Sequence, residues 1–485
     1  MIEAHGTRAV YAAEESLMAT LEEGELMARA VEGLAAVAAA RLEERDGGSV
    51  AALVGPGNNG ADALYAVARL AEAGYAAVAL HHDTVHPGAR EDAVAAGVVL
   101  GTDPGVLAEA DVVLDGVLGI GARPGLPDWA RAWVDAVPDS AYVIAVDLPS
   151  GQDPAGGVLD PDGVLADETV TFSVAKPVHL LPPTEQACGV LTVVDIGIEV
   201  DATPVVRRLD HDDVADLWPV PLASDDKYSR GVVGVVAGGE AYTGAALLAV
   251  TAAVESGAGM VRYVGTPTPE SLVRSRVPEA VHGAGRVQAW VVGPGLDTAS
   301  RARGARAQLD VAREALAGDE PVCVDAGGLD LLDAALLRRR AESPTLLTPH
   351  AGEAARLLSR LTGADVDRAA VAGAPLEQAR RLAAVTGATV LLKGSTTIVV
   401  GPAEGTAAWS QADAPSWLAT AGAGDVLAGL LGTLLAAGLD PAEAGALGAL
   451  VHGVAAGRAN PGGPVRALAV AQALPSTVAV LLARR

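Results

Sequence analysis

The sequence has little cysteine, few aromatic residues and almost no lysine. Only two of its 485 residues are cysteine, aromatic residues make up 3%, and phenylalanine occurs once. Cys188 and Cys323 lie far apart in the chain, which excludes a disulfide framework as the basis of the fold. Because unpaired cysteines are typical of reducing compartments, we expect a cytoplasmic protein.

Long apolar runs and positive charge are also scarce. No stretch of membrane-spanning length is free of polar, glycine or proline interruptions, so no membrane span is expected. The first eight residues lack the basic stretch and apolar core of a secretory signal, and none is expected. The formal net charge is −26, whereas nonspecific binding to nucleic acid needs cationic contacts with phosphate. We therefore expect neither a membrane nor a nucleic acid as partner.

Lysine is concentrated in a few places. Of 34 basic residues, only Lys176, Lys227 and Lys393 are lysine, and each lies within or beside a segment containing proline or glycine. The planar group of arginine cannot replace a compact ammonium everywhere. Two explanations stay open, an accident of composition and a requirement for lysine at these sites.

The residues that are present predict an α/β protein. Half of them are apolar, and the length suits two or three domains. Short apolar runs alternate with helical segments, which is typical of parallel sheets covered by helices. We predict one domain at residues 1–210, a polar and proline-containing linker at 211–224, and a second, different α/β domain at 225–485.

The first glycine-rich turn, residues 55–62, follows a predicted strand and opens a helix. Doubly wound sheets bind ligands at this position, although the spacing matches neither the dinucleotide fingerprint nor the P-loop. Asp115 and Asp147 begin the loops after two further predicted strands. Three polar strand ends would converge on one crevice, where oxygen atoms suit a hard cation. The alternative is that both aspartates only cap their own turns.

The second glycine-rich turn, residues 419–429, reads ATAGAGDVLAG. Small residues bring the backbone close to a ligand, and the first amides of the following helix form an anion site suited to phosphate. Asp425 would be a base for a substrate hydroxyl, which together with a phosphate site is kinase-like chemistry. The alternative is that Asp425 is a simple helix cap. Five further segments could face the same cleft: 227–231, which precedes a predicted strand, and 238–246, 292–296, 347–353 and 392–397, which end or follow predicted strands.

The first half resembles the YjeF N-terminal family, the NAD(P)H-hydrate epimerases, through residues 26–30, 57–62, 146–151 and 171–177. The resemblance covers roughly residues 8–200 and implies a Rossmann-like doubly wound domain. It also implies that K⁺ is held by Asn59, Asp115 and Ser150. The hydrated nicotinamide nucleotide would be bound by Asn58, Asn59, Gly60, Ala61, Asp62, Gly119, Ile120, Gly121, Ala122, Arg123, Pro124, Gly125 and Asp147.

This half departs from the family pattern at two positions. Ala61 and Ala63 stand where the family usually has glycine, and the methyl group of Ala61 is expected to narrow the approach of the nucleotide. Asp147 is our candidate for the acid or base at C6 of the substrate.

The second half, about residues 225–483, resembles the YjeF C-terminal family, the ribokinase-like NAD(P)H-hydrate dehydratases. The resemblance implies that the hydrated nucleotide is bound by Ala245, Gly295, His350 and Asp425. It implies that the adenine nucleotide is bound by Lys393, Gly394, Ser395, Thr396, Thr397 and Gly424. Asp226 stands where histidine is common, and the run Asp-Ala-Gly-Gly-Leu at 325–329 replaces Asp-Ala-Asp-Ala-Leu, so a second acidic group is expected to be lost.

Together the two resemblances imply a fused repair enzyme. The first domain would interconvert the R and S epimers of hydrated NAD(P)H. The second would use ADP and Mg²⁺ to phosphorylate the S epimer, with Asp425 as base and the amides of Ala423 and Gly424 holding the phosphoryl group, and would release AMP and phosphate. A homo-oligomer is expected. Alternatives are a ribokinase-like kinase for a small alcohol with a non-catalytic nucleotide-binding module, or a binding scaffold in the first half.

Overall fold

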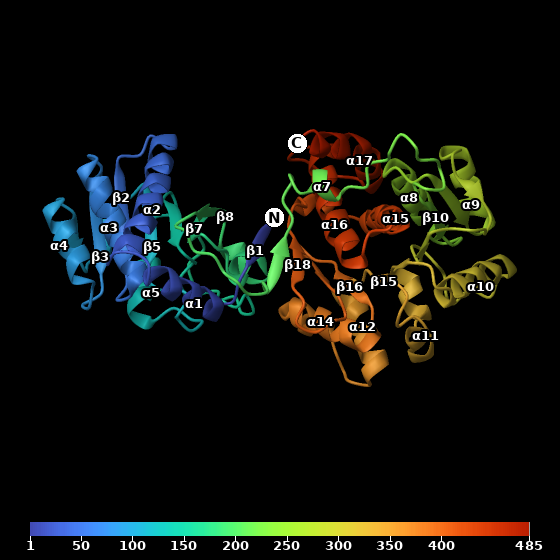
Figure 1. Ribbon diagram of the computed structural model, residues 1–485, viewed down its shortest axis with the longest axis horizontal. Coiled ribbons are helices and arrows are strands. Elements are labelled where there is room, and N and C mark those ends of the chain that lie inside the picture. The colour runs from blue at the N-terminus through green and yellow to red at the C-terminus, as the bar shows by residue number, and fades with distance from the viewer. Residues whose placement is uncertain (485) are drawn as a thin grey trace. The chain divides into compact units, whose positions relative to one another are not determined.

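The computed structural model describes residues 1–484. Within them the chain divides into two compact units (Figure 1). The first unit is residues 3–206. The second begins at Arg207 and also takes in Met1 and Ile2.

The first unit is built on a parallel sheet with the order β4-β3-β2-β5-β6-β7-β8. The chain runs outward from β2 to β4 and then returns to the other side of β2, so the strand order reverses between β2 and β5. This reversal point is where a doubly wound sheet opens a ligand crevice. The Rossmann-like prediction is confirmed. The strands are β2 (Ser49–Val54), β3 (Ala76–His81), β4 (Val99–Gly101), β5 (Val112–Gly116), β6 (Tyr142–Val146), β7 (Glu168–Phe172) and β8 (Val190–Val194).

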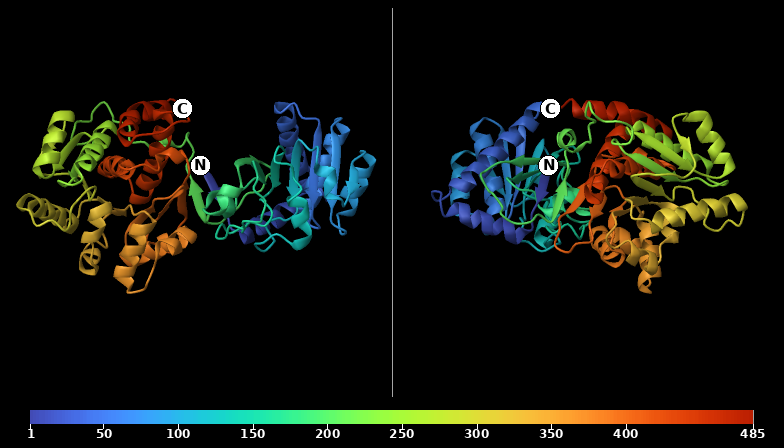
Figure 2. Two further views of the ribbon diagram at one scale, coloured as in Figure 1. Left: turned by 180° about the vertical axis from the view of Figure 1, so that it is seen from behind. Right: turned by 45° about the vertical axis from the view of Figure 1, so that its right-hand side comes forward.

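Helices cover both faces of this sheet because its central strands are apolar on both faces. Along β2, Val50, Ala52 and Val54 belong to the apolar core beneath α2 and α3. The alternate residues Ala51 and Leu53 belong to the core on the opposite face. Figure 2 shows the blue and cyan strands side by side, with helices packed beside them. The helices are α1 (Thr7–Met18), α2 (Glu25–Glu44), α3 (Asn58–Glu72), α4 (Pro87–Ala95), η1 (Pro104–Leu107), α5 (Asp128–Val134), α6 (Pro177–Leu180) and η2 (Thr184–Ala187).

The second unit has a longer sheet with the order β1-β9-β18-β17-β16-β15-β14-β13-β10-β11-β12. The boundaries between the units fall within its edge strands β1 (Ile2–Ala4) and β9. The strands from β16 to β12 in this order are parallel to one another. Strand β17 pairs antiparallel with both of its neighbours, β16 and β18. The strands are β9 (Val206–Arg208), β10 (Val232–Val236), β11 (Met260–Val264), β12 (Val281–His282), β13 (Ala289–Val292), β14 (Val322–Val324), β15 (Thr345–Leu347), β16 (Thr389–Leu392), β17 (Thr397–Val400) and β18 (Ala408–Gln411).

Helix α15 (Ala423–Ala436) crosses this sheet at very short range. A Cβ added at Gly429 would lie 2.2 Å from the Ala249 carbonyl oxygen, and one at Gly432 would lie 2.2 Å from Val291 Cγ2. Glycine at these positions lets α15 pack directly on a helix and a strand. The other helices are α7 (Val214–Leu217), α8 (Thr243–Glu255), α9 (Pro267–Arg276), α10 (Arg303–Ala317), η3 (Ala326–Leu331), α11 (Ala334–Arg339), α12 (Ala351–Thr362), α13 (Arg368–Gly373), α14 (Pro375–Thr386), η4 (Ser416–Leu418), α16 (Pro441–Ala459) and α17 (Ala467–Leu482).

The predicted linker at 211–224 lies within the second unit rather than between the units. It contains the short helix α7, and Val214 and Trp218 are buried in the core of the second unit. Acidic residues and prolines suggested a solvated linker, but the apolar residues between them anchor the segment. No helix described in residues 1–484 is both long and apolar enough to cross a lipid bilayer.

Candidate active sites

A cavity of about 430 Å³ opens in the first unit at the reversal of strand order. The turn after β2 and the loop after β5 form two of its walls, and Asp147 after β6 contributes a third. The cavity brings together the predicted residues Asn58, Asn59, Asp62, Gly119, Ile120, Gly121, Ala122 and Asp147. The sequence analysis missed the side supplied by α1 and α2, which consists of Tyr11, Glu14, Met18, Leu26, Met27 and Ala30.

Two predicted binding residues of the turn face away from this cavity. Ala61 is only 1% exposed and belongs to the core beneath the helix, so the expectation that its methyl group narrows the approach of the nucleotide is wrong. A Cβ on Gly60 would lie 2.1 Å from the Gly55 carbonyl oxygen, so glycine serves the turn itself. Arg123, Pro124 and Gly125 are not part of this cavity lining, and their binding role stays a prediction.

Asp147 occupies a tight turn directly after β6. Its φ is 66°, an unusual value for a residue with a side chain, and the Leu148 N–H donates across it to the Val146 carbonyl at 2.8 Å. Such a conformation costs on the order of 1–3 kcal/mol and tends to occur at functional sites. The turn places the Asp147 carboxylate at the cavity wall.

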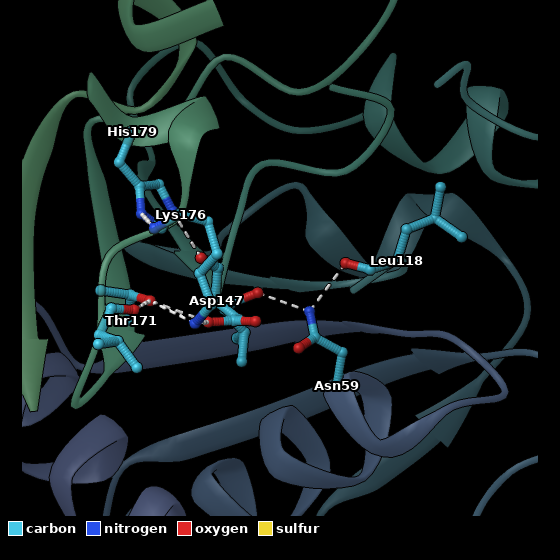
Figure 3. Close-up of polar contacts among 8 residues, drawn as sticks. Asn59, Leu118, Asp147, Thr171, Lys176 and His179 are labelled. Carbon is cyan, nitrogen blue, oxygen red and sulfur yellow. Dashed lines mark hydrogen bonds and ion pairs between the residues drawn. The ribbon is translucent and has the colours of Figure 1, made fainter. Parts of the chain in front are cut away.

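Buried donors fix the Asp147 carboxylate (Figure 3). Lys176 Nζ donates to Asp147 Oδ1 at 2.5 Å, and Thr171 Oγ1 donates to the same oxygen at 2.9 Å. His179 lies behind them, with Nδ1 accepting the Lys176 N–H at 3.0 Å and Nε2 donating to the Asp147 carbonyl at 2.8 Å. Burial, with help from the Lys176 charge, lowers the pKa of His179 to about 4. His179 is therefore a neutral donor that holds the turn.

The three residues predicted to hold K⁺ meet around the Leu118 backbone. Asn59 Nδ2 donates to the Leu118 carbonyl at 2.8 Å, Ser150 Oγ accepts the Leu118 N–H at 2.8 Å, and Ser150 Oγ donates to Asp115 Oδ1 at 2.7 Å. Asn59 Oδ1 makes no hydrogen bond among the described residues. Burial raises the pKa of Asp115 to about 6, although the hydrogen bonds from Ser150 oppose this shift. A group of oxygen atoms with one partly charged carboxyl suits a weakly charged hard cation.

The second unit gathers its polar residues at the carboxyl ends of β13 to β16. Lys393 N–H donates to the Pro349 carbonyl at 2.9 Å, so the loop after β16 lies beside His350. Lys393 Nζ donates to Asp325 Oδ1 at 2.6 Å and lies 3.8 Å from Glu353 Oε2. Burial alone would lower the pKa of Lys393, but Asp325 and Glu353 outweigh it and raise the pKa. Lys393 is therefore charged beside the predicted nucleotide loop.

The run at 325–329 has one acidic residue, Asp325, because position 327 is glycine, and Glu353 on α12 is a second acidic group near the same lysine. A Cβ at Gly327 would lie 2.6 Å from the Leu296 carbonyl oxygen, so this backbone has no room for a carboxylate there. Asp325 instead carries the charge, and Thr348 Oγ1 donates to it at 2.9 Å. Asp325 was noted only as the first residue of the run at 325–329, because its pairing with Lys393 across 68 residues has no local signal.

Asp425 lies in the first turn of α15, which begins after Gly422 at a φ of 91°. Burial first, and the nearby Asp325 charge second, raise the pKa of Asp425 to about 7, while Lys393 opposes them. A carboxyl group with such a pKa can both take and return a proton near neutral pH.

The start of α15 offers a smaller anion site than predicted. The Ala423 N–H already donates to the Thr420 carbonyl at 3.3 Å, which corrects its predicted role. No hydrogen bond of the Gly424 or Asp425 N–H occurs among the described residues. A Cβ on Gly424 would lie 3.3 Å from Lys393 Nζ. A phosphate at the start of α15 would therefore meet the Gly424 and Asp425 amides and the Lys393 ammonium.

The remaining predicted residues of the second unit fall in two places. Gly295 and Ala245 are in direct contact, since a Cβ on Gly295 would lie 2.6 Å from Ala245 Cβ. His350 caps α12, with Nδ1 accepting the Gly352 N–H at 3.0 Å, while Nε2 lies 3.6 Å from Glu353 Oε1. Gly394 and Ser395 are exposed in the loop after Lys393, while Thr396 is buried and Thr397 is half-buried. The binding roles of these residues stay predictions.

Comparison with known proteins gives matches in both units. A family model described as NAD(P)H-hydrate dehydratase matches residues 233–473, and one described as YjeF-related protein N-terminus matches residues 23–178. The chain is 44% identical over 476 residues to the bifunctional NAD(P)H-hydrate repair enzyme Nnr of Mycobacterium leprae, with 94% of each chain covered. It is 44% identical over 451 residues to that of Mycobacterium tuberculosis, with 90% of each covered.

Among solved structures, the chain is similar to the ADP/ATP-dependent NAD(P)H-hydrate dehydratase of Bacillus subtilis co-crystallised with ATP/Mg²⁺. The identity is 26% and the TM-score 0.49, with 57% of this chain and 99% of that chain covered.

Proposed function

This chain belongs to the family of bifunctional NAD(P)H-hydrate repair enzymes, and we propose that each of its two units carries one of the two reactions. The second unit dehydrates the S epimer of hydrated NAD(P)H at the expense of an adenine nucleotide. The first unit converts the R epimer into the S epimer. The observation that carries the proposal is Asp425, which lies with Lys393 and unpaired amides at the start of α15.

In the second unit, Asp425 accepts the proton of the substrate's C6 hydroxyl group. The hydroxyl oxygen then attacks the terminal phosphorus of ADP, and AMP leaves. The phosphate group of the resulting ester departs from C6 far more readily than hydroxide would, and C5 loses a proton to solvent as the C5=C6 double bond returns. The Gly424 and Asp425 amides and Lys393 stabilise the charge of the transferred phosphoryl group. Donors placed in this way are worth about 3 kcal/mol each in other enzymes.

We propose ADP as the phosphoryl donor, bound by the loop from Lys393 to Thr397 and by Gly424. No group of three or more His, Cys, Asp and Glu side chains in the described residues is arranged to hold a metal ion. Mg²⁺, which commonly binds through substrate phosphates and few protein groups, would therefore be held mainly by the nucleotide. When bound, it would neutralise phosphate charge.

In the first unit, Asp147 is proposed to act as the acid or base at C6 of the substrate. Its Oδ1 is held by Lys176 and Thr171, whereas Oδ2 has no hydrogen bond among the described residues and remains available. Asn59, Asp115 and Ser150 would hold K⁺ beside the cavity, where it would offset the negative charge of the surrounding carboxyl groups.

The test is the return of reduced-nicotinamide absorbance from separated R and S hydrates. The purified chain with ADP and Mg²⁺ should restore both, whereas the Asp425→Asn variant should restore neither while still interconverting the epimers. Dehydration by Asp425→Asn at the normal rate would refute the assignment. The small-alcohol kinase alternative is not supported, because the relatives that match nearly the whole chain carry both repair domains.

A further inference from the structure

The cavity of the first unit is unusually acidic for a site that receives a nucleotide. Among its described lining residues, Glu14, Asp62 and Asp147 carry carboxyl groups, and none is lysine or arginine. These walls therefore offer no cationic side chain to the phosphates of the nucleotide. The part of the substrate that suits them is the hydrated nicotinamide ring, especially if the ring becomes cationic during the reaction. This step rests on the proposed epimerase function.

Asp62 is the group that the proposed function leaves unexplained. It lies in the first turn of α3 and lines the cavity, but it is only 8% exposed and its Oδ1 is buried without a hydrogen-bond partner. A buried and unpaired carboxylate is costly, so the neutral acid is the favoured form. Burial first, and then the charges of Asp147 and Glu14, raise the pKa of Asp62 well above its ordinary value.

Asp147 has the opposite environment on the same cavity. The Lys176 ammonium lies 2.5 Å from its Oδ1 and is only 1% exposed, so Asp147 has a buried partner that Asp62 lacks. The groups that face Asp62 are Glu14 on α1 and Asp147 after β6, and Tyr11 on α1 lines the same cavity. Two carboxyl groups in contrasting environments on one cavity, one beside a buried ammonium and one without a hydrogen-bond partner, are a common arrangement for an acid and a base that work together.

We propose that Asp62 is a second catalytic residue of the epimerisation, the proton donor that works with Asp147 as the proton acceptor. The C6–O bond of the substrate breaks, and the departing oxygen keeps the electron pair, takes the proton of Asp62 and leaves as water. The lone pair of N1 forms a C6=N1 double bond, which leaves the ring with one positive charge.

The second half of the reaction reverses these steps on the other face of the ring. A water molecule gives an oxygen lone pair to C6 and a proton to Asp147, and the electrons of the double bond return to N1. The product is the opposite epimer, with no net change in composition. Asp62 then regains a proton from solvent and Asp147 loses one. The acidic walls stabilise the cationic ring between the two steps.

The main test is Asp62→Asn in the full chain, with Asp83→Asn, an exposed position of the same unit, as matched control. Asparagine keeps the size of the side chain but cannot supply a proton. We expect the kcat of epimerisation to fall about 10²- to 10³-fold with little change in KM, while dehydration of the S hydrate stays at the control level. Removal of a buried unpaired acid should not lower the midpoint of thermal unfolding.

A second measurement needs no variant. In water labelled with heavy oxygen, the wild-type chain without ADP should place a labelled oxygen on C6 each time it inverts the epimer, above an enzyme-free control. Inversion with retention of the original oxygen would overturn the proposal, as would an Asp62→Asn variant that epimerises at the control rate. If the wild-type chain does not epimerise at all, the proposed function itself fails, which is a different result.

Discussion

Lys176 Nζ donates to Asp147 Oδ1 at 2.5 Å, and both residues are buried at the edge of the first cavity. The second unit repeats the arrangement, with Lys393 Nζ donating to Asp325 Oδ1 at 2.6 Å. In each case a compact ammonium meets an aspartate at the end of a central strand. Lysine at two of its three positions is thus explained by a buried contact, whereas Lys227 is exposed and lies over the ring of its neighbour Tyr228.

Replacing Lys176 with methionine should destabilise the first unit. The variant leaves the Asp147 carboxylate without its buried counter-ion, and loss of one partner from such a pair costs about 3 kcal/mol. The free energy of unfolding can be followed in denaturant through Trp129 and Trp133, which both lie in this unit. Arg90→Met, at an exposed position of the same unit, is the matched control and should change stability by less than about 0.5 kcal/mol. Equal stability of the two variants would contradict the role of the pair.

The rate of dehydration should depend on the charge of Asp425. Asp425→Asn should lower kcat about 10²- to 10⁴-fold, because the hydroxyl proton loses its acceptor. Glu404→Gln, at an exposed position in the same unit, should keep the wild-type rate. Steady-state kinetics with S hydrate and ADP would measure both. If Asp425→Asn keeps the wild-type kcat and only raises KM, Asp425 is a binding residue and not the base.

The pH dependence of dehydration should follow the same carboxyl group. The pKa of Asp425 is raised to about 7, and only the deprotonated group can accept a proton. The kcat/KM should therefore fall as the pH is lowered through about 7. Asp325→Asn removes a negative charge that raises the pKa of Asp425, so the fall should move to lower pH. If the pH at which kcat/KM falls is unchanged in this variant, or is higher, the coupling of the two aspartates is contradicted.

Ala61→Gly should affect stability rather than substrate binding. Ala61 is buried in the core under α3 and does not line the cavity, so the KM of epimerisation should stay within about twofold. The free energy of unfolding should fall by about 1 kcal/mol, the usual cost of glycine within a helix. A marked drop in KM would instead mean that the methyl group obstructs the nucleotide.

The sequence predicted those parts of the sites that depend on a few consecutive residues. The turns at 55–62 and 419–429 combine glycine with a polar residue at a helix start, so local pattern alone locates Asn59, Asp62 and Asp425. The parallel sheets followed from alternating apolar runs in the same way.

Contacts between distant segments could not be predicted in this way. Glu14 reaches the cavity from α1, and Asp325 meets Lys393 from another strand, so neither contact leaves a local pattern. Ala61 was misjudged because the direction of a side chain depends on the helix packing. The linker was misjudged because Trp218, among prolines and acidic residues, is anchored by a core that the local sequence does not reveal.

The most direct test of two separate sites on one chain is the extent of repair of an R and S mixture with ADP and Mg²⁺. The wild-type chain should return all of the hydrate to reduced nicotinamide. The Asp147→Ala variant should stop once the S epimer is consumed, apart from slow spontaneous epimerisation, because its second unit is intact. The account is contradicted if Asp147→Ala repairs the whole mixture at the wild-type rate. It is also contradicted if the wild-type chain repairs the S epimer and leaves the R epimer behind.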